Sequence, residues 1–282
     1  MTVPHVQVRG HIDQAVSVAI QRVTERSEEM FTSEVASKGN GAASPFQKLL
    51  LPEAKVFSSF ERSLSASLGK AFDYIAADIA KATYGNGEHD YHLHGDIAPE
   101  TLGAIEGIVA RYKAKGEERA MPDTPAELAE LVPVIEANKR TAHRTIKNDV
   151  YFVDHEGFKN YIEIKTVQPN YDTCDKMKTR ILTIHAMLYG TDDKIRALVA
   201  FPHNPNGLAG IYAWPPLRYF LDPEHDWKAR GHALMGPGFW NVVGNAEDTY
   251  DELLSCFYEV SVSRKEEILK LLSLMVEHRE EP

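Results

Sequence analysis

Hydrophobic positions recur at helical spacing in several segments of the chain. The strongest pattern runs over residues 53–83, where one continuous apolar stripe is formed by Val56, Phe60, Leu64, Leu68, Phe72, Ile75 and Ile79. Apolar positions three or four residues apart line one face of an α-helix. Similar spacing or a capping-box sequence predicts further helices over residues 11–37, 99–114 and 172–189, and from Thr124 and from Ser263 onward.

Four other segments have the character of β-strands, namely residues 88–97, 149–154, 159–166 and 195–201. An Asp-His-Glu-Gly tetrapeptide at the junction of the second and third segments is typical of a turn and predicts a β-hairpin. A predicted helix separates the third and fourth segments, which is typical of a crossover and predicts parallel pairing of those strands. The order of elements therefore predicts an α/β or α+β fold with a mixed central sheet flanked by helices.

The composition is that of a globular protein with one large core. The chain has 282 residues, 43% of them hydrophobic, and we expect a single domain with a helical extension over residues 1–50, a core over 53–203 and a C-terminal part with helices over 204–282. Its two cysteines form neither a disulfide framework nor a four-ligand zinc site. No apolar run is long enough for a membrane span and no secretory signal is evident, so we expect a cytoplasmic protein.

Charge is distributed unevenly along the sequence. The whole chain carries a formal net charge of −10, which by itself disfavours nucleic-acid binding. Residues 139–180, however, contain nine basic and six acidic side chains, a local net charge of +3. A positive zone on an acidic protein can bind DNA, although solvated charges that fall together by chance would give the same count.

The predicted hairpin brings a small set of reactive side chains together. Side chains alternate between the faces of a strand, so Glu163 and Lys165 share one face while Ile162 and Ile164 point to the other. Asp149 opens the neighbouring strand, where its carboxylate can converge with that of Glu163.

This arrangement suits the hydrolysis of a phosphodiester bond. Two carboxylates, Asp149 and Glu163, together with the main-chain carbonyl of Ile164, can hold Mg²⁺, which prefers hard oxygen ligands. Such an ion polarises the scissile phosphate and activates water, and the Lys165 ammonium can stabilise developing negative charge. The alternative is an exposed Glu–Lys pair on a sheet edge, worth at most about 1 kcal/mol.

The segment Asn148–Asn170, which contains Asn-Asp149 and Glu163-Ile-Lys165, resembles the catalytic core of PD-(D/E)xK nucleases, and more specifically the TdeIII-like family of Type II restriction endonucleases. The resemblance runs from about residue 45 to about residue 260 and includes four further segments, Phe60–Gly69, Ile184–Met187, Phe201–Asn206 and Gly238–Trp240. The Glu-x-Lys motif is common, and its combination with these segments is much more specific. Asn148 stands where the superfamily name has proline, a position at which replacement is frequent.

The resemblance implies a restriction-endonuclease-like core and a homodimeric enzyme that cleaves double-stranded DNA with Mg²⁺ and leaves 5′-phosphate ends. Members of this family are associated with the interrupted palindrome GGNCC. Carried over to this sequence, the resemblance makes Asp149 and Glu163 metal ligands and Lys165 the catalytic lysine. Glu61, on the long helix before the sheet, matches the position of an additional acidic residue in many nucleases of the superfamily.

Other polar residues near the motif are candidates for DNA contacts, and each has a plain structural alternative. If residues 139–147 are helical, Arg140, Arg144 and Lys147 share a face that could meet phosphates or only solvent. Lys176 and Lys178 follow the motif and have the same two interpretations. Gln168 and Asn170 could read a base edge or form a turn.

Two other functions remain compatible with the sequence. One is a PD-(D/E)xK repair or phage nuclease without sequence specificity, and the other is a DNA-binding module that keeps the fold without catalysis. A defined plasmid would give a smear with the first and no cleavage with the second.

Overall fold

The structure is a computed structural model of the chain. It describes residues 3–32, 52–114, 121–165, 168–191, 194–205, 207, 214–221, 223–224 and 232–277. These residues form two compact units, one made of residues 1–4 and 72–252 and the other of residues 5–71 and 253–282. The expected parts of the chain, divided at residues 50 and 203, are each continuous in sequence, whereas each of these units combines segments that are distant in sequence. The expectation of a single nuclease domain stays a prediction.

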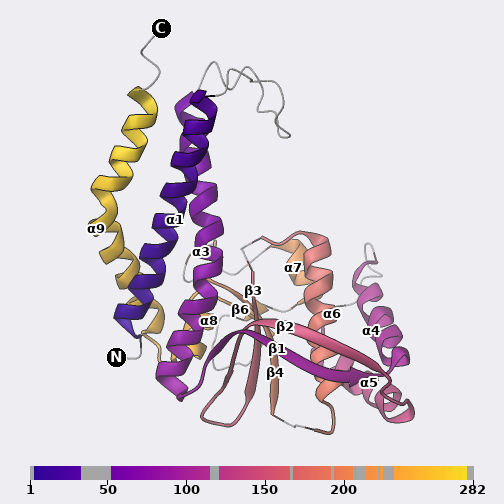
Figure 1. Cartoon of the computed structure of the whole chain (residues 1–282). Coiled ribbons are helices and arrows are strands. Elements are labelled where there is room, and N and C mark those ends of the chain that lie inside the picture. Colours follow the sequence, from indigo (N-terminus) through magenta and orange to yellow (C-terminus); the bar gives the residue numbers. More distant parts are fainter. Residues whose placement is uncertain are drawn as a thin grey trace. The chain divides into compact units, whose positions relative to one another are not determined.

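The larger unit is built on a six-stranded mixed sheet in the order β1-β2-β3-β4-β6-β5 (Figure 1). The strands are β1 (Glu88–Ile97), β2 (Ala142–Val153), β3 (Lys159–Ile164), β4 (Ile195–Phe201), β5 (Pro223–Glu224) and β6 (Ala233–Met235). The first three strands pair in antiparallel fashion, and β4 runs parallel to β3. The predicted mixed sheet, hairpin and parallel crossover are therefore confirmed.

One face of the sheet is covered by three helices: α4 (Pro99–Tyr112), α5 (Thr124–Ala137) and α6 (Tyr171–Leu188). Their apolar side chains share one core with Tyr161 of β3 and Val199 of β4. The short helix α7 (Pro215–Phe220) adds Leu217 and Phe220 to this core. Tyr161, which lies on the same face of its strand as Glu163, is buried beneath these helices. On this face of β3, only the C-terminal end, which carries Glu163, can take part in polar chemistry.

The opposite face contacts the C-terminal part of α3 (Pro52–Tyr84) and α8 (Pro237–Gly244). Tyr84 stacks on Phe152 of β2 with ring centroids 4.9 Å apart, and its hydroxyl donates to the carbonyl of Val242 at 2.5 Å. Trp240 packs against Phe72 on the same helix α3. With helices on both sides, most of β4 is buried, which is why its sequence is a nearly continuous apolar run.

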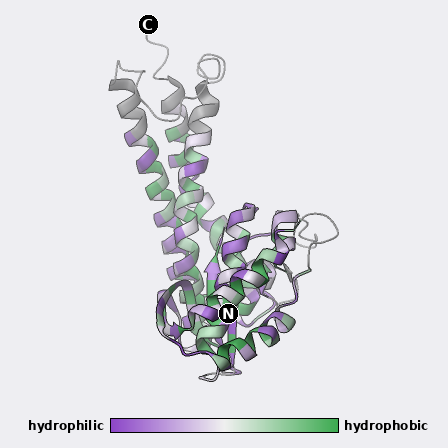
Figure 2. Ribbon diagram, turned by 90° about the vertical axis from the view of Figure 1, so that its right-hand side faces the viewer, coloured by the Kyte–Doolittle hydropathy of each residue, from purple (hydrophilic) through white to green (hydrophobic). Residues whose placement is uncertain are grey.

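The smaller unit consists of long helices: α1 (His5–Thr32), the first part of α3, and most of α9 (Thr249–Glu277). Apolar and polar residues alternate along them (Figure 2). Arg264 links α9 to α1, because its guanidinium donates to the carboxylate of Asp13 at 2.6 Å. Among the described residues, no helix combines the length and the apolar character that a membrane crossing requires.

Several predicted boundaries were wrong. β2 begins at Ala142 rather than Asp149, and residues 142–147 are not helical because they pair with residues 92–97 of β1. Such long-range pairing overrides a charged local sequence. Likewise, α9 begins at Thr249 and runs through Ser263, whose hydroxyl donates to the carbonyl of Val260 as in a helix interior. The helix predicted from Thr124 does begin there, but its N-cap is Asp123, whose carboxylate accepts from the amide of Ala126 at 3.0 Å. The predicted helix over 11–37 begins at His5, and its last five residues lie outside the described residues.

A buried ion pair joins the three helices α4, α5 and α6. The ammonium of Lys178 is fully buried, pairs with Glu127 and donates to the hydroxyl of Thr124 at 3.0 Å. Tyr112 of α4 donates to the same Glu127 carboxylate. Burial lowers the pKa of Lys178, and the carboxylate beside it opposes that effect.

Removing one member of this pair should be costly. We expect Lys178→Met to lower the free energy of unfolding by about 3–5 kcal/mol, because it leaves the Glu127 carboxylate buried without its counter-charge. The double variant Lys178→Met/Glu127→Leu should lose less, since no charge is then left unpaired. Urea denaturation of both variants measures the difference, and a double variant that is less stable than the single one would contradict this account.

Candidate active site

The site forms where strands β2 and β3 part. Their ladder ends at the pair Val150 and Ile162, and continuing the same register would set Asp149 opposite Glu163. Beyond that pair the amide of Ile164 donates to the Oδ2 atom of Asp149 at 2.7 Å, so a side chain replaces the backbone partner. The expected convergence of the two carboxylates therefore follows from the register of the hairpin.

Lys165 lies directly after β3 and faces both carboxylates. Its ammonium pairs with Oε1 of Glu163 and lies 4.0 Å from Oδ2 of Asp149. The two acidic side chains are largely buried, whereas the lysine side chain is 35% exposed and keeps access to solvent. The structure thus brings the three predicted catalytic residues together at one point.

The surroundings of Asp149 favour its neutral form. Burial of the carboxyl group raises its pKa, and the nearby charge of Glu163 raises it further. The amide of Ile164 and the cations Lys165 and Arg180 act in the opposite direction. Two partly buried carboxylates that repel one another are a suitable place for a cation.

The donor set fits Mg²⁺ better than a transition metal. Asp149 and Glu163 offer hard carboxylate oxygens, and the main-chain carbonyl of Ile164 belongs to the same segment. Within the described residues, histidine, cysteine and acidic side chains form no group of three that could hold a metal ion. Mg²⁺ keeps several waters and is commonly held by one or two carboxylates, so two protein carboxylates suffice for it.

Arg180 is a member of the site that the sequence interpretation missed. Its guanidinium Nη2 lies 3.2 Å from Oε2 of Glu163 and also donates to the carbonyl of Lys147 at 2.5 Å. We counted Arg180 only as part of the basic zone. Its position midway along α6, in the crossover that follows β3, is the one signal that could have indicated a contact with the hairpin.

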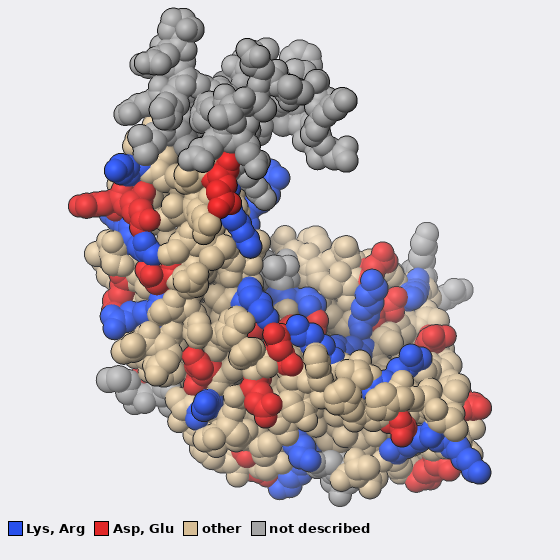
Figure 3. Space-filling view, viewed as in Figure 1, with Lys and Arg blue, Asp and Glu red and all other residues tan. Residues whose placement is uncertain are grey.

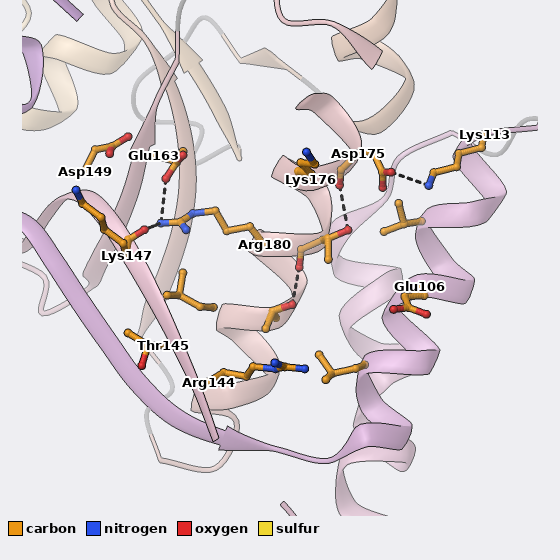
Figure 4. A pocket seen from close by; sticks show the side chains of 15 residues that line it. Glu106, Lys113, Arg144, Thr145, Lys147, Asp149, Glu163, Asp175, Lys176 and Arg180 are labelled. Carbon is orange, nitrogen blue, oxygen red and sulfur yellow. Dashed lines mark hydrogen bonds and ion pairs between the residues drawn. The ribbon is translucent and has the colours of Figure 1, made fainter. Parts of the chain in front are cut away.

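A pocket of about 880 Å³ opens beside the carboxylates (Figure 4). Asp149 and Glu163 line one end of it, and the walls come from α4, β2 and α6. Five basic side chains line the pocket: Lys113, Arg144, Lys147, Lys176 and Arg180. Four acidic side chains line it as well, namely Glu106, Asp149, Glu163 and Asp175. Figure 3 shows Lys and Arg side chains interspersed with acidic ones on this unit.

The predicted DNA-contacting residues divide into two groups. Arg144, Lys147 and Lys176 are exposed and line the pocket, although Lys147 also pairs with Asp90 at 2.8 Å. The prediction for Lys178 was wrong because its side chain is fully buried against Glu127.

Other candidates have structural contacts that account for them. Arg140 donates to the carbonyls of Met187 and Tyr189 at 3.0 and 2.6 Å, which satisfies the C-terminal end of α6. Asn170 is the N-cap of the same helix, where its side chain accepts from the amide of Thr173. Gln168 is exposed and adopts a positive φ of 60°. For Asn170 the geometry therefore supports a role in forming the turn rather than in reading a base edge.

Glu61 belongs to the smaller unit. It is exposed on the first part of α3. Its role as an additional acidic residue stays a prediction.

Comparison with known proteins identifies the class of the chain. The sequence matches the family described as Type II restriction endonuclease, HinfI, over residues 8–261. It is 26% identical over 267 residues to the Type II restriction enzyme HgiCII of Herpetosiphon aurantiacus, and the match covers 94% of each chain. The Type II restriction enzymes HgiBI and HgiEI of the same organism are each 24% identical over the same length and coverage.

The protein is a Type II site-specific deoxyribonuclease and so binds DNA. It belongs to the HinfI family of Type II restriction endonucleases. The broad identification made from the sequence, a Type II restriction endonuclease, is confirmed, and the resemblance to the TdeIII-like family stays a prediction.

Proposed function

We propose that this enzyme cleaves double-stranded DNA by a Mg²⁺-dependent PD-(D/E)xK mechanism. The observation that supports this most strongly is the meeting of Asp149, Glu163 and Lys165 where β2 and β3 part. Asn148 stands before Asp149 in place of the motif's proline. The other three positions of the motif, Asp149, Glu163 and Lys165, are intact.

Each residue of the motif has a distinct task in this proposal. Asp149, Glu163 and the Ile164 carbonyl hold Mg²⁺, whose bound form supplies polarisation of the scissile phosphodiester and a more acidic water. Lys165 places its ammonium beside the same carboxylates, where it orients the attacking water and stabilises negative charge that develops on the phosphate. Partial burial of the two carboxylates strengthens these electrostatic effects.

Cations in the pocket account for part of the DNA affinity. We expect Arg144→Gln and Lys176→Gln each to reduce the slope of log K against log salt concentration by about 1, because each removes one phosphate contact. Fluorescence anisotropy of a labelled duplex in Ca²⁺ or EDTA, measured across a salt series, gives these slopes.

A matched control comes from the other side of the sheet. Lys81 is exposed in the last turn of α3, which contacts the opposite sheet face, so Lys81→Gln should leave the slope unchanged. Unaltered slopes in both pocket variants would show that the pocket does not contact the DNA backbone.

We further propose that the enzyme acts as a homodimer on the interrupted palindrome GGNCC and leaves 5′-phosphate ends. A twofold-symmetric site is most simply read by a twofold-symmetric dimer with one active site for each strand. The proposal for GGNCC rests on the resemblance to TdeIII-like enzymes.

Duplexes that carry GGNCC, or one altered outer base pair, test this part of the proposal. Cleavage of only the intact site is expected, with product ends that accept label from polynucleotide kinase only after dephosphorylation. Cleavage at another sequence would refute GGNCC and leave the proposed chemistry standing.

A further inference from the structure

Arg180 holds three oxygen atoms of the active-site hairpin at once. Its Nη2 atom lies 3.2 Å from Oε2 of Glu163, 2.5 Å from the carbonyl of Lys147 and 2.8 Å from Oδ1 of Asn148. The arginine side chain is 17% exposed, so water competes little for these contacts. Figure 4 shows the guanidinium reaching from α6 towards Glu163 and the backbone of β2.

Asn148 fixes the arginine in turn. The Asn148 side chain is fully buried, and its Nδ2 donates to the carbonyls of Ile146 at 3.1 Å and Tyr91 at 3.4 Å. These two bonds fix the orientation of the amide, so that Oδ1 faces Arg180. A proline at position 148 would offer no such acceptor. Two hydrogen bonds and an ion pair thus connect β1 through Asn148 and Arg180 to Glu163.

The two oxygens of Glu163 have different partners. Oε2 is held by Arg180, whereas Oε1 pairs with Lys165, whose ammonium also lies 4.0 Å from Asp149. Arg180 therefore restrains the rotation of the carboxylate and leaves Oε1 on the side of Lys165. Hydrogen-bond partners behind a metal ligand orient it, and their loss commonly weakens metal binding by about 10–100-fold.

We propose that Arg180, anchored by Asn148, is a positioning residue that orients Glu163 for metal binding. This inference rests on the proposed metal site at Asp149 and Glu163. Charge alone gives the opposite expectation, because a cation beside Glu163 repels a bound metal ion. Loss of Arg180 would then tighten metal binding. The direction of the change separates positioning from simple charge compensation.

The test measures direct binding of Mn²⁺ to the DNA-free protein. The readout is the electron paramagnetic resonance signal of free Mn²⁺. Mn²⁺ is a suitable probe because it accepts the same oxygen ligands. Arg180→Met should raise the dissociation constant about 10-fold or more. Arg180→Lys should also weaken binding, because lysine keeps the charge but its side chain is one atom shorter and does not bring the ammonium to the position of Nη2.

A double-mutant cycle tests the anchoring role of Asn148. Asn148→Ala should weaken Mn²⁺ binding less than Arg180→Met does, and the double variant should bind no more weakly than Arg180→Met alone. Such non-additivity is expected when two residues act through one network. Fully additive effects would overturn the link between Asn148 and Arg180.

Arg196 provides a control for loss of a buried arginine. It pairs with Asp154 at 3.0 Å at the turn end of the same hairpin and is 14% exposed. Arg196→Met should lower the melting temperature but leave the Mn²⁺ dissociation constant unchanged. Melting curves of every variant ensure that Mn²⁺ is titrated into folded protein.

The outcomes separate this inference from the proposed function. Mn²⁺ binding that is unchanged or tighter in Arg180→Met, together with binding lost in Asp149→Asn, would overturn the role of Arg180 and leave the metal site intact. Mn²⁺ binding that is unchanged in Asp149→Asn would overturn both the metal site and the inference.

Discussion

Replacing Asp149 with asparagine is expected to slow DNA cleavage by about 1000-fold or more, equivalent to roughly 4 kcal/mol of transition-state stabilisation. Asparagine has nearly the same shape and can still accept the hydrogen bond from the amide of Ile164, so the fold should persist. What it loses is the negative charge that the metal requires. Single-turnover cleavage with excess enzyme measures the change.

Asp154 offers a matched control on the same hairpin. Its carboxylate accepts from the turn amides of Glu156 and Phe158 and pairs with Arg196, away from Glu163. Asp154→Asn should therefore retain cleavage at a temperature where it is folded. If Asp149→Asn cleaved as fast as Asp154→Asn, Asp149 would not be a metal ligand.

Replacing Lys165 with methionine is expected to slow cleavage by about 100–1000-fold through loss of electrostatic stabilisation in the transition state. The same change should leave Mn²⁺ binding intact or make it tighter, because the ammonium lies against both carboxylates in the structure. Slow cleavage with preserved metal binding would distinguish a catalytic lysine from a structural one. Asp149→Asn should instead lose both activities.

Lys194 serves as the control for Lys165. Its ammonium donates to the carbonyl of Glu156 in the hairpin turn, so Lys194→Met should cleave at the wild-type rate. Normal cleavage by Lys165→Met would contradict the catalytic role, and weakened Mn²⁺ binding in that variant would indicate that the lysine shapes the metal site.

Local sequence patterns predicted the elements that determine the position of the site. The apolar stripe over residues 53–83 corresponds to α3, and the predicted strands over 88–97 and 195–201 coincide with β1 and β4. The turn after Asp154 fixed the hairpin, and a hairpin register sets which residues face one another. The proximity of Asp149 and Glu163 could be predicted for this reason.

What could not be predicted depends on contacts between distant segments. Residues 142–147 became strand because β1 pairs with them, and no local pattern within that charged segment signals such pairing. Lys178 looked like a solvent-facing cation because its partner Glu127 lies 51 positions earlier in the sequence. Arg180 and Lys178 are neighbours on α6 with different surroundings, which only the packing of that helix decides.

The net charge of the chain also fails to describe the charge around the site. A net charge of −10 disfavours DNA binding when it is averaged over the chain. The pocket nevertheless gathers five basic side chains from three elements or their flanking residues beside the carboxylates of Asp149 and Glu163. Because surface charges more than about 10 Å apart are largely screened at physiological salt, this local arrangement matters more for DNA than the total.

The most direct test of the central claim is digestion of unmethylated phage DNA by the purified protein, in Mg²⁺ and in EDTA. The account predicts discrete fragments in Mg²⁺ and intact DNA in EDTA. Discrete fragments in EDTA would contradict the metal-dependent mechanism. A smear in Mg²⁺, or no cleavage of several unmethylated DNAs, would contradict site-specific cleavage by Asp149, Glu163 and Lys165.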